Sequence, residues 1–144
     1  MKLSDIIDSW KKDAPIDDLN LDLEAARIPT LHSKYITLLS EARSRLRGLV
    51  IERKNVIRKL RDYYLGSSSQ EELEEMGREP YLHRVLKNEV MTYIEADALL
   101  IDMDTKISVQ EEKVEVLTEI MKAINNRNFA IKSMIEWKRL MVGG

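Results

Sequence analysis

The chain has 144 residues, of which 33% are charged and 6% aromatic, and its formal net charge is −2. It has no cysteine, which excludes a disulfide framework, a thiolate nucleophile and a sulfur-ligated metal. No apolar run approaches about 20 residues, which excludes a membrane-spanning helix. This composition is typical of long exposed helices, so we expect an all-α fold with coiled-coil-like packing.

The N-terminal third predicts two helices. The first ten residues form a short amphipathic pattern with Ser4 as a plausible N-cap. Asp17 and Asp18 suit the start of the next helix, where carboxylates favour the helix dipole. Pro29 either kinks one continuous helix or opens a new one, and both alternatives are open at this point. The helical pattern is then sustained over residues 31–65.

Two stripes run along the segment that follows. Between Arg43 and Arg61 there are eight basic residues and one acid, Glu52, a net charge of +7. At about 100° per residue, five of the cations fall within roughly 60° of one another. This set is named the basic rail: Arg43, Arg47, Lys54, Arg58 and Arg61. A separate apolar stripe, interrupted once by Arg53, is expected to face a partner helix: Leu39, Ala42, Leu46, Leu49, Val56, Leu60 and Tyr63.

The middle of the chain predicts a connection. Glycine and serine at positions 66–69 end the long helix, and the acidic run 71–75 leads to Pro80. We therefore expect a flexible acidic connection over residues 67–80. The acidic run is most simply a soluble linker, and the alternative is that it mimics phosphate for a partner. A further helix is expected from about Tyr81, with a break or bend near Asn125.

The C-terminal half carries the candidate contacts between subunits. Long helices with narrow apolar stripes are too long for a 144-residue chain to cover, so we expect an oligomer. The candidate oligomerisation residues are Val114, Leu117, Met121, Ile124, Phe129, Ile131, Met134, Ile135 and Trp137. Packing within one chain is the alternative for them. The expected organisation is an N-terminal helical region over 1–66 that carries the rail, the connection over 67–80, and an oligomerisation region over 81–144.

Several segments resemble one known family. The run RKLRDYYLG from Arg58 is similar to the basic Asp-Tyr-Tyr element of the UvsY proteins, recombination mediators of T-even-like phages. The N-terminal KKD from Lys11, LEAA from Leu23 and FAIK from Phe129 also resemble that family, in the same order. The similarity spans most of the chain and is weak between Ser67 and Lys122.

The resemblance implies an all-helical subunit that assembles into a homo-oligomeric, heptameric ring. It further implies binding of single-stranded DNA, loading of a phage RecA-like recombinase onto strands coated by the phage single-strand-binding protein, and a place in the cytoplasm of the infected bacterial host. Arg58 matches a basic position of the family motif. Lys59 fills a small position and Arg61 a leucine position, so their assignment to the site comes from this sequence alone.

The residues themselves favour binding over catalysis. Cations along a helix with neighbouring aromatic side chains suit a phosphate backbone. The best candidates for phosphate contact are Arg58, Lys59 and Arg61, with Lys54, Arg47 and Arg43 in support. Tyr64 is either a stacking partner or a structural residue at the helix end. An oligomeric scaffold whose rail binds an acidic protein segment is the alternative function. No motif indicates a catalytic site, a metal or a cofactor, so we expect no enzyme.

Overall fold

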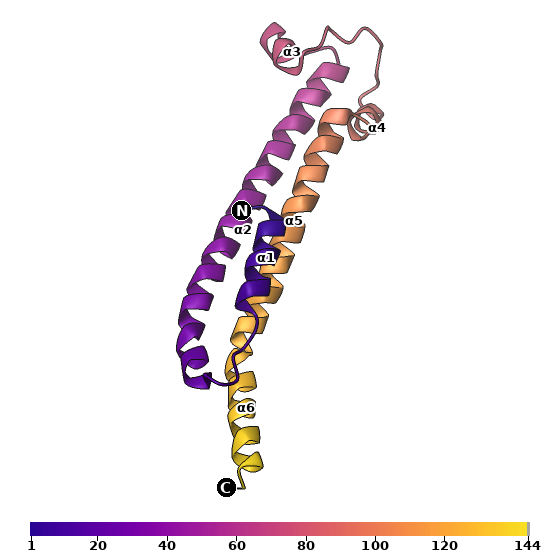
Figure 1. Ribbon diagram of the computed structural model, residues 1–144. Helices are drawn as coiled ribbons and strands as arrows, with labels where there is room; N and C mark the ends of the chain where they lie inside the picture. The colour runs from indigo at the N-terminus through magenta and orange to yellow at the C-terminus, as the bar shows by residue number, and fades with distance from the viewer. Residues whose placement is uncertain (144) are drawn as a thin grey trace. The chain divides into compact units, whose positions relative to one another are not determined.

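The computed structural model describes residues 1–143, which form helices and no strand. The helices are α1 (Leu3–Asp13), α2 (Leu21–Tyr64), α3 (Gln70–Met76), α4 (Val90–Glu95), α5 (Ala98–Asn125) and α6 (Arg127–Met141) (Figure 1). The expected all-α fold is confirmed. The chain divides into two compact units, residues 1–44 with 111–144 and residues 45–110.

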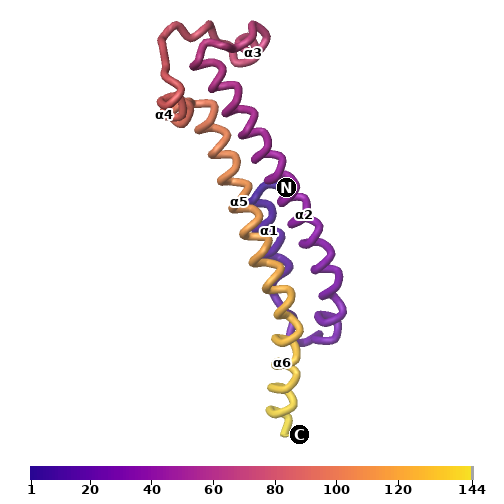
Figure 2. The backbone as a smooth tube through the Cα atoms, turned by 180° about the vertical axis from the view of Figure 1, so that it is seen from behind, coloured from indigo at the N-terminus to yellow at the C-terminus, as the bar shows by residue number. Residues whose placement is uncertain are grey.

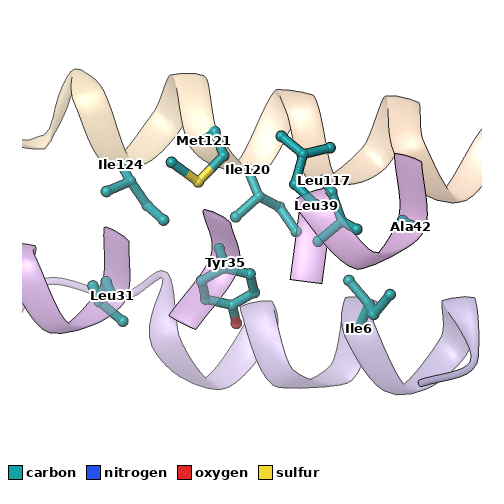
Figure 3. Close-up of a cluster of buried hydrophobic side chains, with 9 residues drawn as sticks. All are labelled: Ile6, Leu31, Tyr35, Leu39, Ala42, Leu117, Ile120, Met121 and Ile124. Atoms are coloured by element: carbon teal, nitrogen blue, oxygen red, sulfur yellow. The ribbon is translucent and has the colours of Figure 1, made fainter. Parts of the chain in front are cut away.

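The first unit is built around an apolar cluster shared by α1, α2 and α5. Ile6, Tyr35 and Leu117 are fully buried there, among the side chains drawn in Figure 3. Trp10 packs edge-on against the ring of Tyr35, with 5.5 Å between ring centroids. The hydroxyl of Tyr35 donates to the Asp13 carboxylate at 2.8 Å, so the polar end of this buried side chain is satisfied.

Several candidate oligomerisation residues belong to this core. Leu117, Met121 and Ile124 are buried in the cluster, and Val114 packs against it. The structure thus gives these residues the role that the sequence left as the alternative, packing within one chain. The side chains of Leu117, Met121 and Ile124 are therefore not exposed on the surface of a protomer.

Helix α6 presents a different picture. Ile131 is buried and Met134 is half-buried, whereas Phe129, Ile135 and Trp137 are exposed. Arg127, at the start of α6, is buried and donates to the carbonyl oxygens of Ala14 and Pro15 and to the Glu24 carboxylate, at 2.8–3.1 Å. These contacts anchor the first turn of α6 and leave an apolar face outside.

Helix α2 is continuous over 44 residues and contains Pro29 in its interior. Of the two alternatives for Pro29, the opening of a new helix is therefore wrong. The expected helix starts also differ. The carboxylate of Asp17 accepts from the amide of Leu19 in a turn, and α2 begins only at Leu21. Ser4 is not an N-cap, because α1 already begins at Leu3.

The second unit contains the end of α2, the start of α5 and the segment that connects them. The expected long helix from Tyr81 is wrong: α4 covers six residues, and α5 begins at Ala98. The reason lies in Asp97, whose carboxylate accepts from the amide of Leu99 and so favours a helix start at this point. Helix α3 occupies the middle of the expected connection, and its first turn is capped by Ser69.

Candidate nucleic-acid interface

The basic rail lies on the exposed face of α2. In the second unit two side chains of the apolar stripe are buried in separate clusters. Leu49 packs with Met103 and Ile107 of α5, and Leu60 belongs to the other cluster. Because the cations are offset from that stripe by about a third of a turn, burial of the stripe leaves them in solvent. The exposure of the rail therefore follows from the period of the helix.

Arg53, the polar interruption of the stripe, is matched by a carboxylate on α5. Its Nε lies 2.6 Å from Oδ1 of Asp104. The guanidinium of a half-exposed arginine between two helices can pair with a carboxylate and still contact water. Arg53 is thus part of the packing and not of the rail.

Most of the rail carries positive charge without a nearby acid. Arg47, Lys54 and Arg61 are exposed and have no carboxylate within ion-pair distance among residues 1–143. Arg43, at the end of the first unit, is exposed and unpaired in the same sense. Glu52, the single acid of the segment, lies 3.7 Å from Arg45 off the rail. The positive charge of the rail is therefore available to an anionic partner.

Arg58 and Lys59 are placed differently. Arg58 lies 3.2 Å from Asp62, one turn along α2, and 3.1 Å from Glu72 of α3. Lys59 lies 3.1 Å from Glu75, also of α3. The acidic helix thus contacts the two cations that precede the tyrosine pair. Figure 2 shows α3 beside the C-terminal end of α2.

Tyr64 belongs to an aromatic cluster at the end of α2. Its ring is 5.0 Å from both Tyr63 and Tyr81 and 5.6 Å from Tyr93, measured between centroids. Its hydroxyl donates to the Asp97 carboxylate at 2.6 Å. Burial and this hydrogen bond raise the pKa of Tyr64 to about 12. The contacts match the structural alternative for Tyr64, since stacking on a base would require the ring to leave the cluster.

The aromatic cluster is tied together by an ion pair that sequence reasoning missed. Asp97 is buried, and Arg78 donates to both of its oxygens at 2.7 and 2.9 Å. The guanidinium of Arg78 also lies 4.8 Å from the centroid of the Tyr63 ring. Burial alone would raise the pKa of Asp97, but hydrogen bonds from Arg78, Tyr64 and the Leu99 amide hold it below its usual value.

Two kinds of feature are absent from the described residues. Residues 1–143 contain no group of three or more histidine, aspartate or glutamate side chains placed to hold a metal ion. In the same range, no helix is long and apolar enough to cross a membrane. The exposed cations of α2 are consequently the feature with the clearest potential ligand, an anionic polymer.

Comparison with known proteins identifies the family. The family model described as "Recombination, repair and ssDNA binding protein UvsY" matches residues 9–144. The chain belongs to the UvsY family. This membership supports a role in recombination and repair and in binding single-stranded DNA.

The relatives of this UvsY chain include proteins of known structure. It is 27% identical over 143 residues to the recombination protein uvsY of Enterobacteria phage T4, and 99% of each chain is covered. Two crystal structures of the bacteriophage T4 recombination mediator protein UvsY superpose on it with TM-scores of 0.83 and 0.81, at 26% and 28% identity. They cover 97% and 100% of this chain, and 99% of their own. The fold is therefore that of the family along nearly the whole chain.

The contacts of Asp97 predict a pH-dependent contribution to stability. Asp97→Asn should lower the free energy of unfolding at pH 7 by about 1–3 kcal/mol, because it removes the charged acceptor of the Arg78 hydrogen bonds. The pKa of Asp97 is lowered in the folded state, so its contribution is complete above about pH 4 and is lost as the pH falls through the lower, folded value. Urea unfolding followed by circular dichroism at pH 7 and pH 3 measures the difference.

Asp102→Asn is the matched control, because Asp102 is exposed on α5 and pairs with Lys106 one turn away. Its effect should stay within about 0.5 kcal/mol at both pH values. Equal effects of the two variants, or a pH-independent effect of Asp97→Asn, would contradict the assignment.

Proposed function

We propose that this chain binds single-stranded DNA through the basic rail, with Lys59 beside it. The observation that carries the proposal is the row of exposed cations on one face of one helix, most of them without an acidic partner. From Arg47 to Arg61 the rail spans 14 residues, about 21 Å at 1.5 Å per residue. That length accommodates a short run of phosphates.

Phosphate contacts of this kind imply binding without base preference. Arginine and lysine neutralise the backbone and release its counterions, which gives affinity that depends on salt and not on sequence. Stacking usually accompanies such contacts, but here Tyr64 is engaged with Asp97. The rail would then hold a strand by its backbone and leave the bases accessible.

Self-association would multiply this modest site. Three exposed apolar side chains share one face of α6, namely Phe129, Trp137 and Leu140, and supply a surface that a second copy can cover. A homo-oligomeric ring, a heptamer as in the family resemblance, would repeat the rail around its circumference. Linked sites then bind one strand at a high effective concentration. Assembly is thus assigned to the C-terminal region and DNA contact to the N-terminal region.

A protein that holds a single strand by its backbone could act as a recombination mediator. A ring of rails would compete with a single-strand-binding protein for phosphates and present the strand to a RecA-like recombinase. The solved relatives from phage T4 carry the name recombination mediator. We place the activity in the cytoplasm of an infected bacterial host, without an enzymatic step.

A second candidate function has its own observation. Arg58 and Lys59 already bind carboxylates of the acidic helix α3, so this end of α2 can accept an acidic protein segment. A scaffold that binds such a segment would not need DNA. The two candidates differ in whether the assembled protein binds an oligonucleotide.

The rail is tested with Lys54→Ala/Arg58→Ala/Arg61→Ala, by fluorescence anisotropy of labelled oligo-dT over a salt series. Loss of three phosphate contacts should weaken binding at least tenfold and make the log–log salt slope shallower by about 2, at about 0.7 per contact for a single strand. Light scattering in parallel should give an unchanged mass.

The matched control is Lys11→Ala/Lys12→Ala/Lys132→Ala, which removes the same charge at exposed positions of the first unit. It should retain most of the affinity and the slope of the wild type. Failure of the assembled wild type to bind oligo-dT at low salt would refute the DNA site and favour the acidic-segment scaffold.

Assembly is tested with Phe129→Ser/Trp137→Ser. These side chains are 72% and 62% exposed, so their replacement should leave the helix content seen by circular dichroism unchanged. Light scattering should show a lower mass, because apolar contact area between copies is lost. Glu136→Gln, on the same helix, should keep the wild-type mass. An unchanged mass in the double variant would place the interface elsewhere.

A further inference from the structure

We propose that α3 is an internal competitor of DNA, whose carboxylates occupy the phosphate positions at Arg58 and Lys59 until a strand displaces them. The inference rests on the proposed DNA site and adds a regulatory element to it. It concerns contacts within the second unit, between α2 and α3.

The contacts put acids where phosphates would bind. Glu72 lies 3.1 Å from Arg58, and Glu75 lies 3.1 Å from Lys59. The two glutamates are three residues apart on α3, so they share one face of that helix. Each meets one of two adjacent cations. Carboxylate oxygens at this spacing satisfy the guanidinium and the ammonium much as phosphate oxygens would.

Helix α3 is a self-contained element. Ser69 accepts from the amide of Glu72 at its N-terminus, and the left-handed Gly77 ends it, with the Arg78 amide donating to the Leu73 carbonyl. Both ends are therefore capped by local residues. The hydrogen bonds that cap the helix are thus made within residues 69–78.

Two apolar side chains attach α3 to the rest of the unit. Leu73 is buried, at 5% exposure, and Met76 packs against the cluster that contains Leu60. A hollow of about 250 Å³ lies along one side of α3, between Gln70, Leu73 and Tyr81. A second hollow of about 290 Å³ is lined by Lys59, Met76 and Leu99. The two ion pairs between α3 and α2 are partly exposed to solvent, where such pairs are weak.

These features make displacement by a strand feasible. A multivalent phosphate chain that engages Lys54 and Arg61 has a high local concentration at Arg58 and can replace Glu72 there. While α3 occupies the cations, only the open fraction of molecules offers the full site, and the apparent affinity falls by that fraction. Binding in a ring would favour long strands, which engage several rails at once, over short ones.

The test compares two pairs of charge-removing variants on the same helix. Glu72→Gln/Glu75→Gln removes the competing carboxylates. Glu71→Gln/Glu74→Gln removes the same charge from exposed positions that contact no cation of α2 in the described structure. Each pair takes one acid from the first turn and one from the second, so helix-dipole effects are matched.

Oligo-dT anisotropy should separate the pairs. Glu72→Gln/Glu75→Gln should bind about three- to tenfold more tightly than the wild type, as expected if α3 is closed in most molecules. Glu71→Gln/Glu74→Gln should stay within about twofold. Equal gains in both pairs would mean a general charge effect and overturn the inference. No gain, or weaker binding, in the 72/75 pair would mean that α3 helps to form the site, which overturns it too.

Hydrogen exchange supplies a second readout. On addition of oligo-dT to the wild type, amides in residues 70–76 should exchange faster while those in 54–64 exchange more slowly. Slower or unchanged exchange in 70–76 contradicts displacement. If the wild type binds oligo-dT and the variants do not differ, the inference fails alone. If the wild type does not bind, the proposed function fails and the inference falls with it.

Discussion

Helix α2 supports two surfaces that must not interfere with each other, and the period of one uninterrupted helix keeps them apart. Its apolar stripe is buried against neighbouring helices, as Leu39 and Leu60 illustrate, while cations offset by about a third of a turn remain in solvent. A break at Gly48 would rotate the later part of both sets relative to the earlier part, and neither would remain a continuous stripe. The single polar residue in the stripe, Arg53, is tolerated because Asp104 meets it at 2.6 Å.

Charge in this protein is organised locally, because the whole chain is slightly acidic at −2. Positive charge gathers on α2, and acidic α3 contacts its C-terminal end through Glu72 and Glu75. Such an arrangement limits attraction of polyanions to one face of one helix. On that face Arg58 is paired, whereas Lys54 before it and Arg61 after it have no carboxylate within ion-pair distance among residues 1–143. A strand that engages these open cations first would reach Arg58 at high effective concentration.

Features that depend on residues three or four apart could be predicted from the sequence: the all-α fold, the exposed rail, the buried stripe and the break at Asn125. Features that depend on distant residues could not. Glu72 is 14 residues from Arg58, and Asp97 is 33 from Tyr64, so no local pattern signals either contact. The error over the helix from Tyr81 has a local cause, because the Asp97 carboxylate accepts from the amide of Leu99 two residues on and favours a helix start there. Leu117 illustrates another limit of sequence patterns. An apolar stripe does not reveal whether the surface that covers it belongs to the same chain or to another copy.

The central claim, that the rail is where the strand lies, is tested most directly by photo-cross-linking. The assembled wild-type protein would be irradiated with an oligo-dT that contains 4-thiothymidine, and the cross-linked peptides mapped by mass spectrometry. The account predicts cross-links concentrated in residues 47–64, which salt suppresses as it suppresses binding. Cross-links confined to residues 1–42 or 111–143, with none in 47–64, would contradict it.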